Sequence, residues 1–137
     1  MISLAQPFDP IRFNLLVGWT GMVAGAVSGA GVGLFFHRDD WLGGYASFQR
    51  RLVRLGHIAF FGLGIINVLF ALSLTVLQVP APFARFASAG FAVAVVAMPA
   101  CCFLTAWRTG LRHLFPIPVA AVLCGMGGLR FGWIGGC

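Results

Sequence analysis

The sequence predicts an all-α integral membrane protein, a four-helix transmembrane bundle. Three observations predict it: 60% of the 137 residues are hydrophobic, only 9% are charged, and long apolar stretches alternate with short arginine-bearing ones. Soluble domains carry about 25% charged residues. A soluble chain of this length would leave much of its apolar surface in water, so a bilayer is the solvent that fits it.

Four segments are long and apolar enough for a helix to cross the hydrocarbon core, which takes about 20 residues. They are residues 15–36, 57–77, 86–107 and 116–134. Pro80 and Pro82 follow the second segment and end it. Because no long linker or low-complexity tract separates the four, residues 1–137 are expected to form a single transmembrane domain.

The arginines predict which loops face the cytoplasm. Six of the nine lie in the loops after the first and third spans, and three lie toward the opposite side. The two groups are Arg38, Arg50, Arg51, Arg54, Arg108 and Arg112, and Arg12, Arg85 and Arg130. Cytoplasmic loops carry the excess of positive residues, so both termini are expected on the periplasmic side. Arginine without lysine, beside abundant Ala, Gly and Val, is typical of a GC-rich genome and indicates a bacterial inner membrane.

The loop between the first two spans contains the stretch YASFQRRLVRLGH. It places Phe48, Leu52 and Leu55 on one side of a helix and three arginines toward the other. This pattern predicts a short amphipathic helix at the headgroup level, the alternative being an extension of the second span. The candidate contacts for anionic lipid or haem propionates are Arg50, Arg51, Arg54 and Arg112. A simpler interpretation is that these arginines only set the topology.

Glycine recurs every fourth residue along the first span, and a similar series marks the last one. The first stripe is Gly21, Gly25, Gly29 and Gly33, and the second includes Gly128, Gly132 and Gly136. Small residues at this spacing form a glycine zipper that lets helix backbones approach closely. We therefore expect the first and last spans to pack against each other. Contact with another subunit and a smooth wall for a flat cofactor are the alternatives.

The three histidines all fall at the predicted cytoplasmic edge. Haem is commonly held by axial histidines, so His57 with His37 or His113 is a candidate pair for haem b. His37 also lies beside Asp39 and Asp40, and with His57 or His113 these side chains would form a His/carboxylate set that suits zinc or iron. The remaining interpretation is that these are interfacial histidines at helix ends.

Motifs for catalysis are absent from the sequence. It contains no Gly-x-Ser-x-Gly, no His-Glu-x-x-His and no phosphate loop, and no Asp, Glu or Lys lies in any span. The four cysteines form no C-x-x-C pair and are expected to pack as small apolar residues. Asn67, in the middle of the second span, is expected to make an interhelical hydrogen bond. No basic face interleaved with polar residues exists, so no nucleic-acid partner is expected.

These features favour a non-catalytic subunit of a larger energy-transducing membrane complex, respiratory or photosynthetic. One alternative is a b-type haem protein that carries electrons through the histidines. A second is a transporter-like protein or an assembly factor. The expected partners are membrane lipid together with other protein subunits or a second copy of the chain.

Overall fold

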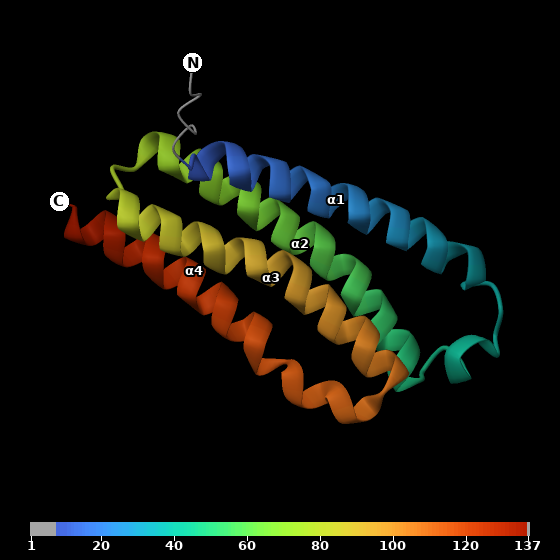
Figure 1. The fold of residues 1–137 in the computed structure, drawn as a ribbon. Coiled ribbons are helices and arrows are strands. Elements are labelled where there is room, and N and C mark those ends of the chain that lie inside the picture. Colours follow the sequence, from blue (N-terminus) through green and yellow to red (C-terminus); the bar gives the residue numbers. More distant parts are fainter. Residues whose placement is uncertain (1–7, 137) are drawn as a thin grey trace, which may run out of the picture.

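The computed structural model describes residues 8–136, and within this range the chain forms helices and no strand (Figure 1). The elements are α1 (Pro10–Phe35), η1 (Trp41–Gly43), α2 (Phe48–Val76), α3 (Ala81–Trp107), η2 (Thr109–Leu114) and α4 (Pro116–Gly135). The four α-helices are long and apolar enough to span a membrane. The all-α prediction is therefore confirmed. The arginines predict that both termini lie on the periplasmic side. The terminal residues 1–7 and 137 lie outside the described residues.

Caps and prolines decide where the helices begin. The Asp9 side chain accepts hydrogen bonds from the backbone N–H groups of Ile11 and Arg12, at 2.9 and 3.4 Å, ahead of Pro10 at the first helical position. Ser47 accepts one from the Arg50 N–H at 3.1 Å and so caps α2. The first three helices consequently start five to nine residues before the predicted spans. Side-chain caps extend α1 and α2, and α3 begins at the prolines Pro80 and Pro82 without a side-chain cap.

No separate amphipathic helix forms between α1 and α2. Residues 48–56 are the first turns of α2, and the helix continues through Gly56 and His57 without a break. Gly56 is tolerated there because it packs closely: a methyl group placed on it would lie 3.0 Å from the Phe103 ring of α3. The structure therefore shows the alternative, in which residues 48–56 extend the second helix.

The helices pack in chain order, α1 on α2, α2 on α3 and α3 on α4, with α1 also touching α3. Figure 1 shows α1 and α4 on opposite sides of the central pair. Among the described residues these two outer helices form no substantial interface, so the prediction that the first and last spans pack together was wrong. Because α3 is central, 50% of the residues in its most apolar stretch are buried. The corresponding share is 17% in α1 and 17% in the segment Thr109–Gly135, which contains α4.

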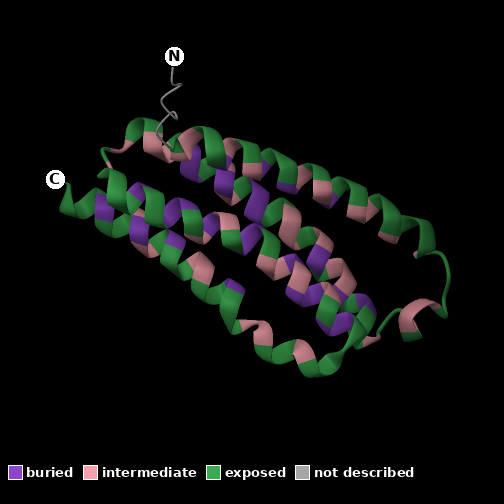
Figure 2. Ribbon diagram, viewed as in Figure 1, coloured by how far each residue is buried: buried purple, intermediate pink, exposed green. Residues whose placement is uncertain are grey.

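Two apolar clusters form the core along α2 and α3. One joins Leu63 to Ala94 and Val95, and the other joins Phe70 to Ala87 and Phe91. Figure 2 shows the buried residues gathered along the facing sides of these helices, while the outer sides of α1 and α4 are exposed. Large apolar side chains such as Leu16, Val76 and Leu123 remain on the outer surface, as expected where lipid rather than water surrounds a protein.

The first glycine stripe packs on α2 rather than on α4. Methyl groups placed on Gly21, Gly25 and Gly29 would lie 2.6 to 3.0 Å from side chains of α2 and α3. Gly33 faces open space, because a four-residue row turns by about 40° per step and leaves the contact after three steps. The closest backbone contact between α1 and α2 joins Gly18 to Gly64, where a methyl group on Gly18 would lie 2.7 Å from the Gly64 carbonyl oxygen.

The second stripe packs on α3 and on the turn before it. A methyl group on Gly128 would lie 3.0 Å from the Phe86 ring, and one on Gly132 would lie 2.6 Å from Phe83. At Gly136 the nearest atom would be the carbonyl oxygen of Gln78, at 3.0 Å. Each stripe therefore packs mainly on a helix adjacent in the chain, α2 for α1 and α3 for α4, since short loops bring sequential helices together.

Candidate functional site

The connection between α1 and α2 is organised around Arg50, whose side chain is only 1% exposed. Its Nη2 donates to the carbonyl oxygen of Phe36 at 2.6 Å, and its Nη1 donates to that of Arg38 at 3.3 Å. These carbonyls lie just past the end of α1, where backbone acceptors lack helical partners and the helix dipole favours a cation. One arginine of α2 thus caps the end of α1.

Three aromatic rings surround the same guanidinium. Its carbon lies 4.5 Å from the ring centre of Phe36, 5.2 Å from that of Tyr45 and 5.5 Å from that of Trp41. Phe36 and Tyr45 also meet edge to face, with centroids 5.8 Å apart. The rings offer their electron-rich faces to a cation that has left water. We call this arrangement, Arg50 with Phe36, Trp41 and Tyr45, the arginine cage.

The loop backbone adopts an unusual turn to place these rings. Leu42 has a φ of 53°, in the left-handed region that non-glycine residues seldom adopt, and Gly43 and Gly44 follow with φ of 80° and 94°. The Ser47 hydroxyl donates to the Leu42 carbonyl oxygen at 2.6 Å while it caps α2. A single serine therefore ties the turn to the start of the next helix.

The arginines predicted to contact lipid or propionates differ in their surroundings. Arg50 is enclosed by the cage, so its guanidinium faces the protein rather than headgroups. Arg54 is half-buried, with its guanidinium 5.1 Å from the Tyr45 ring centre. Arg51 and Arg112 are exposed, the latter in η2. Sequence reasoning missed the cage, although aromatic residues flanking a loop arginine are the signal that could have indicated it.

His57 lies in the α1–α2 interface. A methyl group placed on Gly29 would lie 3.0 Å from its Nδ1, and the Phe61 ring stands edge-on at 6.4 Å between centroids. Nδ1 is buried without a hydrogen-bond partner. Since the backbone of α1 closes off that side of the ring, Nε2 is the nitrogen that remains for a ligand.

The other two histidines lie elsewhere. His37 follows the end of α1 and is exposed, eight residues after Gly29, the residue that His57 faces. His113 is exposed in η2, which packs on α3 and α4 rather than on α1. The structure therefore places the three histidines in three different surroundings and shows no shared site for them.

The acidic residues near His37 have other neighbours. Asp40 pairs with Arg38 at 3.6 Å, and Asp39 is exposed. Within residues 8–136 no three His, Cys, Asp or Glu side chains gather as a metal-binding group. The proposed metal set of His37, Asp39 and Asp40 is therefore not assembled.

Two buried asparagines connect the helices at depth. Asn67 Nδ2 donates to the carbonyl oxygen of Phe91 in α3 at 3.1 Å and to that of Leu63 at 2.8 Å. The predicted interhelical hydrogen bond of Asn67 is confirmed. Asn14, which sequence reasoning missed, donates from α1 to the Ser88 hydroxyl of α3. Such bonds hold helices together where the surroundings offer no water.

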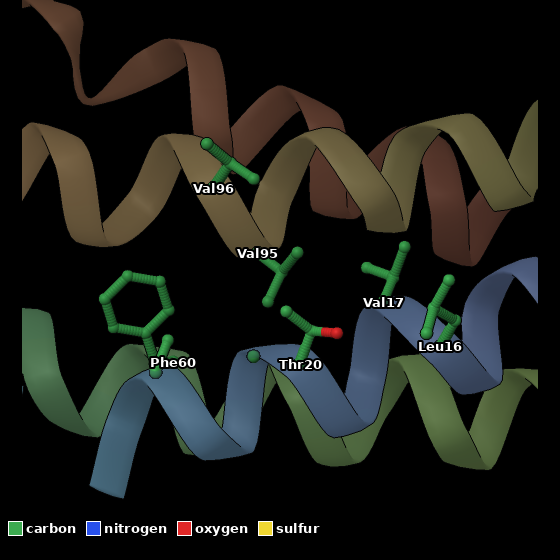
Figure 3. Close-up of a pocket in the computed structure, with 8 residues that line it drawn as sticks. Leu16, Val17, Thr20, Phe60, Val95 and Val96 are labelled. Atoms are coloured by element: carbon green, nitrogen blue, oxygen red, sulfur yellow. The ribbon is translucent and has the colours of Figure 1, made fainter. Parts of the chain in front are cut away.

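An apolar groove of about 270 Å³ opens between α1 and α3 (Figure 3). It is lined by Leu16, Val17, Thr20, Gly21, Ala24, Phe60, Val95 and Val96. Figure 3 shows Thr20 of α1 and Val95 of α3 on opposite walls. Leu16 and Val96 at the rim are 69% and 65% exposed, since α4 does not extend over this side of α3. We call this feature the α1–α3 groove.

The described residues form an all-helical protein with four helices that are long and apolar enough to span a membrane. Comparisons with protein-family models, with curated proteins and with solved structures gave no match for this chain.

Proposed function

We propose that this chain is an integral membrane protein and a non-catalytic subunit of a larger energy-transducing complex, respiratory or photosynthetic. The proposal places all four α-helices across a bacterial inner membrane, with the arginine-rich end in the cytoplasm. The lengths and hydropathy of the four helices support insertion. The arginine distribution supports the orientation, because cytoplasmic loops carry the positive excess.

The observation that carries the subunit proposal is the uncovered α1–α3 groove. Its walls are apolar, and on the α1 side the accessible lining residues Thr20 and Ala24 are small, which lets another helix approach closely. A volume of about 270 Å³ matches a few side chains of a partner helix and falls below the range for a drug-sized ligand. A transmembrane helix of a partner subunit is the occupant that fits these walls.

The test is purification of the tagged protein in mild detergent, followed by native electrophoresis and mass spectrometry. We expect the wild type to migrate with stoichiometric partner subunits. Val96→Trp fills the groove and should release the chain from them. The matched control is Leu104→Trp, at another exposed position of the same helix. A colourless chain without any stoichiometric partner would contradict the proposal, as would equal behaviour of the two variants.

A b-type haem protein is the second candidate, and the surroundings of His57 favour it. The ring sits between a glycine and an aromatic edge, and α1 closes off only the Nδ1 side, which leaves Nε2 for an axial ligand bond. Reduced-minus-oxidised visible spectra of the purified protein decide between the candidates. Soret and α bands that disappear in His57→Ala would favour haem. Absorption that arises only from co-purified subunits would favour the subunit proposal.

A further inference from the structure

Two neighbouring pockets lie at the arginine-rich end of the helices, and Gln49 and Trp107 line both of them. The inner pocket, of about 390 Å³, is completed by Leu42, Val53, Phe103 and Ala106. The outer pocket, of about 510 Å³, is completed by Arg108, Thr109, Gly110 and Leu111. Because they share two walls, we treat them as one feature, the end groove. It lies between the start of α2 and the connection from α3 to η2.

The end groove changes from apolar to polar along the direction of α3. Val53 and Phe103 line the inner part, whereas Arg108 and Thr109 come after the last helical residue, Trp107. An amphiphile in this groove would have its apolar part toward the helices and its polar part toward their ends. A phospholipid has the same polarity in a bilayer when the helices cross it.

The charge at this end matches an anionic headgroup. Arg51, Arg108 and Arg112 are exposed, and no described residue forms an ion pair with Arg108. Of the two acids in the α1–α2 connection, Asp40 is paired with Arg38 and Asp39 is exposed. An arginine guanidinium binds phosphate through a planar set of donors.

Trp107 supports the same location. Its side chain is 88% exposed at the last turn of α3, between the apolar and the polar parts of the groove. Tryptophan is enriched where a membrane meets water, because its ring is apolar and its N–H is polar. The headgroup region of the bilayer is therefore expected at the level of Trp107.

We propose that the end groove binds one anionic phospholipid, with an acyl chain against Val53 and Phe103 and the phosphate at Arg108. The inference rests on the proposed membrane insertion but not on any partner subunit. Its site is separate from the arginine cage, whose guanidinium is already occupied by Phe36 and Arg38 carbonyls. The α1–α3 groove is separate too, since the two share no lining residue.

The experiment uses fluorescence quenching of Trp107 in phosphatidylcholine vesicles. The protein carries the substitutions Trp19→Phe, Trp41→Phe and Trp133→Phe, so that all tryptophan fluorescence comes from Trp107. Phosphatidylglycerol with brominated acyl chains is compared with brominated phosphatidylcholine as the quencher. We expect the anionic lipid to bind at Trp107 roughly fivefold more tightly, the factor that corresponds to about one surface charge. Arg108→Gln should abolish this preference.

The matched control is Arg85→Gln, an exposed arginine at the opposite end, which should keep the preference. Equal quenching by the two lipids, or a preference that survives Arg108→Gln, would overturn the proposal. Vesicle flotation tests insertion separately, because a chain that fails to float with lipid contradicts the membrane proposal itself. The three Phe substitutions could prevent folding, and a second measurement then avoids them. Native mass spectrometry counts the lipid molecules bound to the chain that keeps all its tryptophans, and it compares Arg108→Gln with Arg85→Gln in the same way.

Discussion

At the scale of residues, Arg50 shows how burial changes the role of a charge. Three arginines follow one another closely at the start of α2, and their residue type predicts a shared task at the headgroup level. Arg50 instead donates to two carbonyls beyond α1 and contacts three rings, while Arg51 is exposed. Arg50 and Arg51 differ in burial because they lie on different sides of α2, and the preceding turn sets which side of α2 faces the end of α1.

Replacing Arg50 by Gln should lower the free energy of unfolding by about 3 kcal/mol, because two hydrogen bonds from a charged donor are lost. Arg50→Lys should fall between Gln and the wild type, since an ammonium keeps the charge but lacks the planar fork. Denaturation in detergent, followed by tryptophan fluorescence, measures both effects. Arg51→Gln is the exposed control and should change stability by less than about 0.5 kcal/mol. A loss of similar size in the control would show that the cage contributes nothing specific.

At the scale of elements, the glycines determine how closely neighbouring helices approach. The four-residue spacing predicts a smooth face, and the structure does use Gly21, Gly25 and Gly29 for packing. The spacing does not identify the partner helix, because α2 and α4 both offer glycines. On α2 it is Gly64 that meets α1, a residue outside both stripes. A regular row therefore indicates a contact surface, whereas the closest backbone contact between α1 and α2 depends on a single glycine in the facing helix.

Gly64→Ala should destabilise the protein by about 1 to 3 kcal/mol, the usual cost of overpacking a tight contact. The added methyl group would lie 2.8 Å from the carbonyl oxygen of Gly18, a backbone atom that moves only if the helices separate. Gly33→Ala is the control, because that position faces open space and alanine favours a helix. The same denaturation assay applies. Two variants of equal stability would mean that α1 and α2 do not approach closely at Gly18.

At the scale of the whole molecule, the helices form a row that leaves α1 and α4 apart. This arrangement leaves the α1–α3 groove uncovered and brings all the loop arginines between residues 38 and 54, and between 108 and 112, to the same end. The proposed orientation and the proposed lipid site both depend on that shared end.

Cysteine labelling in intact cells tests the orientation. In a chain whose native cysteines are replaced by alanine, Pro82→Cys should react with a membrane-impermeant maleimide, because the start of α3, where Pro82 lies, is expected outside. Asp39→Cys should react only after the membrane is permeabilised. Both positions are exposed in the structure, so accessibility to the reagent depends on the side of the membrane. The reverse pattern would contradict the orientation, and labelling of both in intact cells would contradict insertion across the membrane.

The all-α class, the four apolar helices and the interhelical role of Asn67 could be predicted from the amino-acid sequence, because they depend on local composition and on polar groups placed in apolar stretches. The tertiary structure decided which helices are neighbours, that residues 48–56 extend α2, and that Arg50 is buried while His37, His57 and His113 lie in different surroundings. The physical reason is that each of these outcomes depends on contacts between distant residues. A glycine row or a histidine has the same local signature whichever helix it faces, and only packing selects the partner.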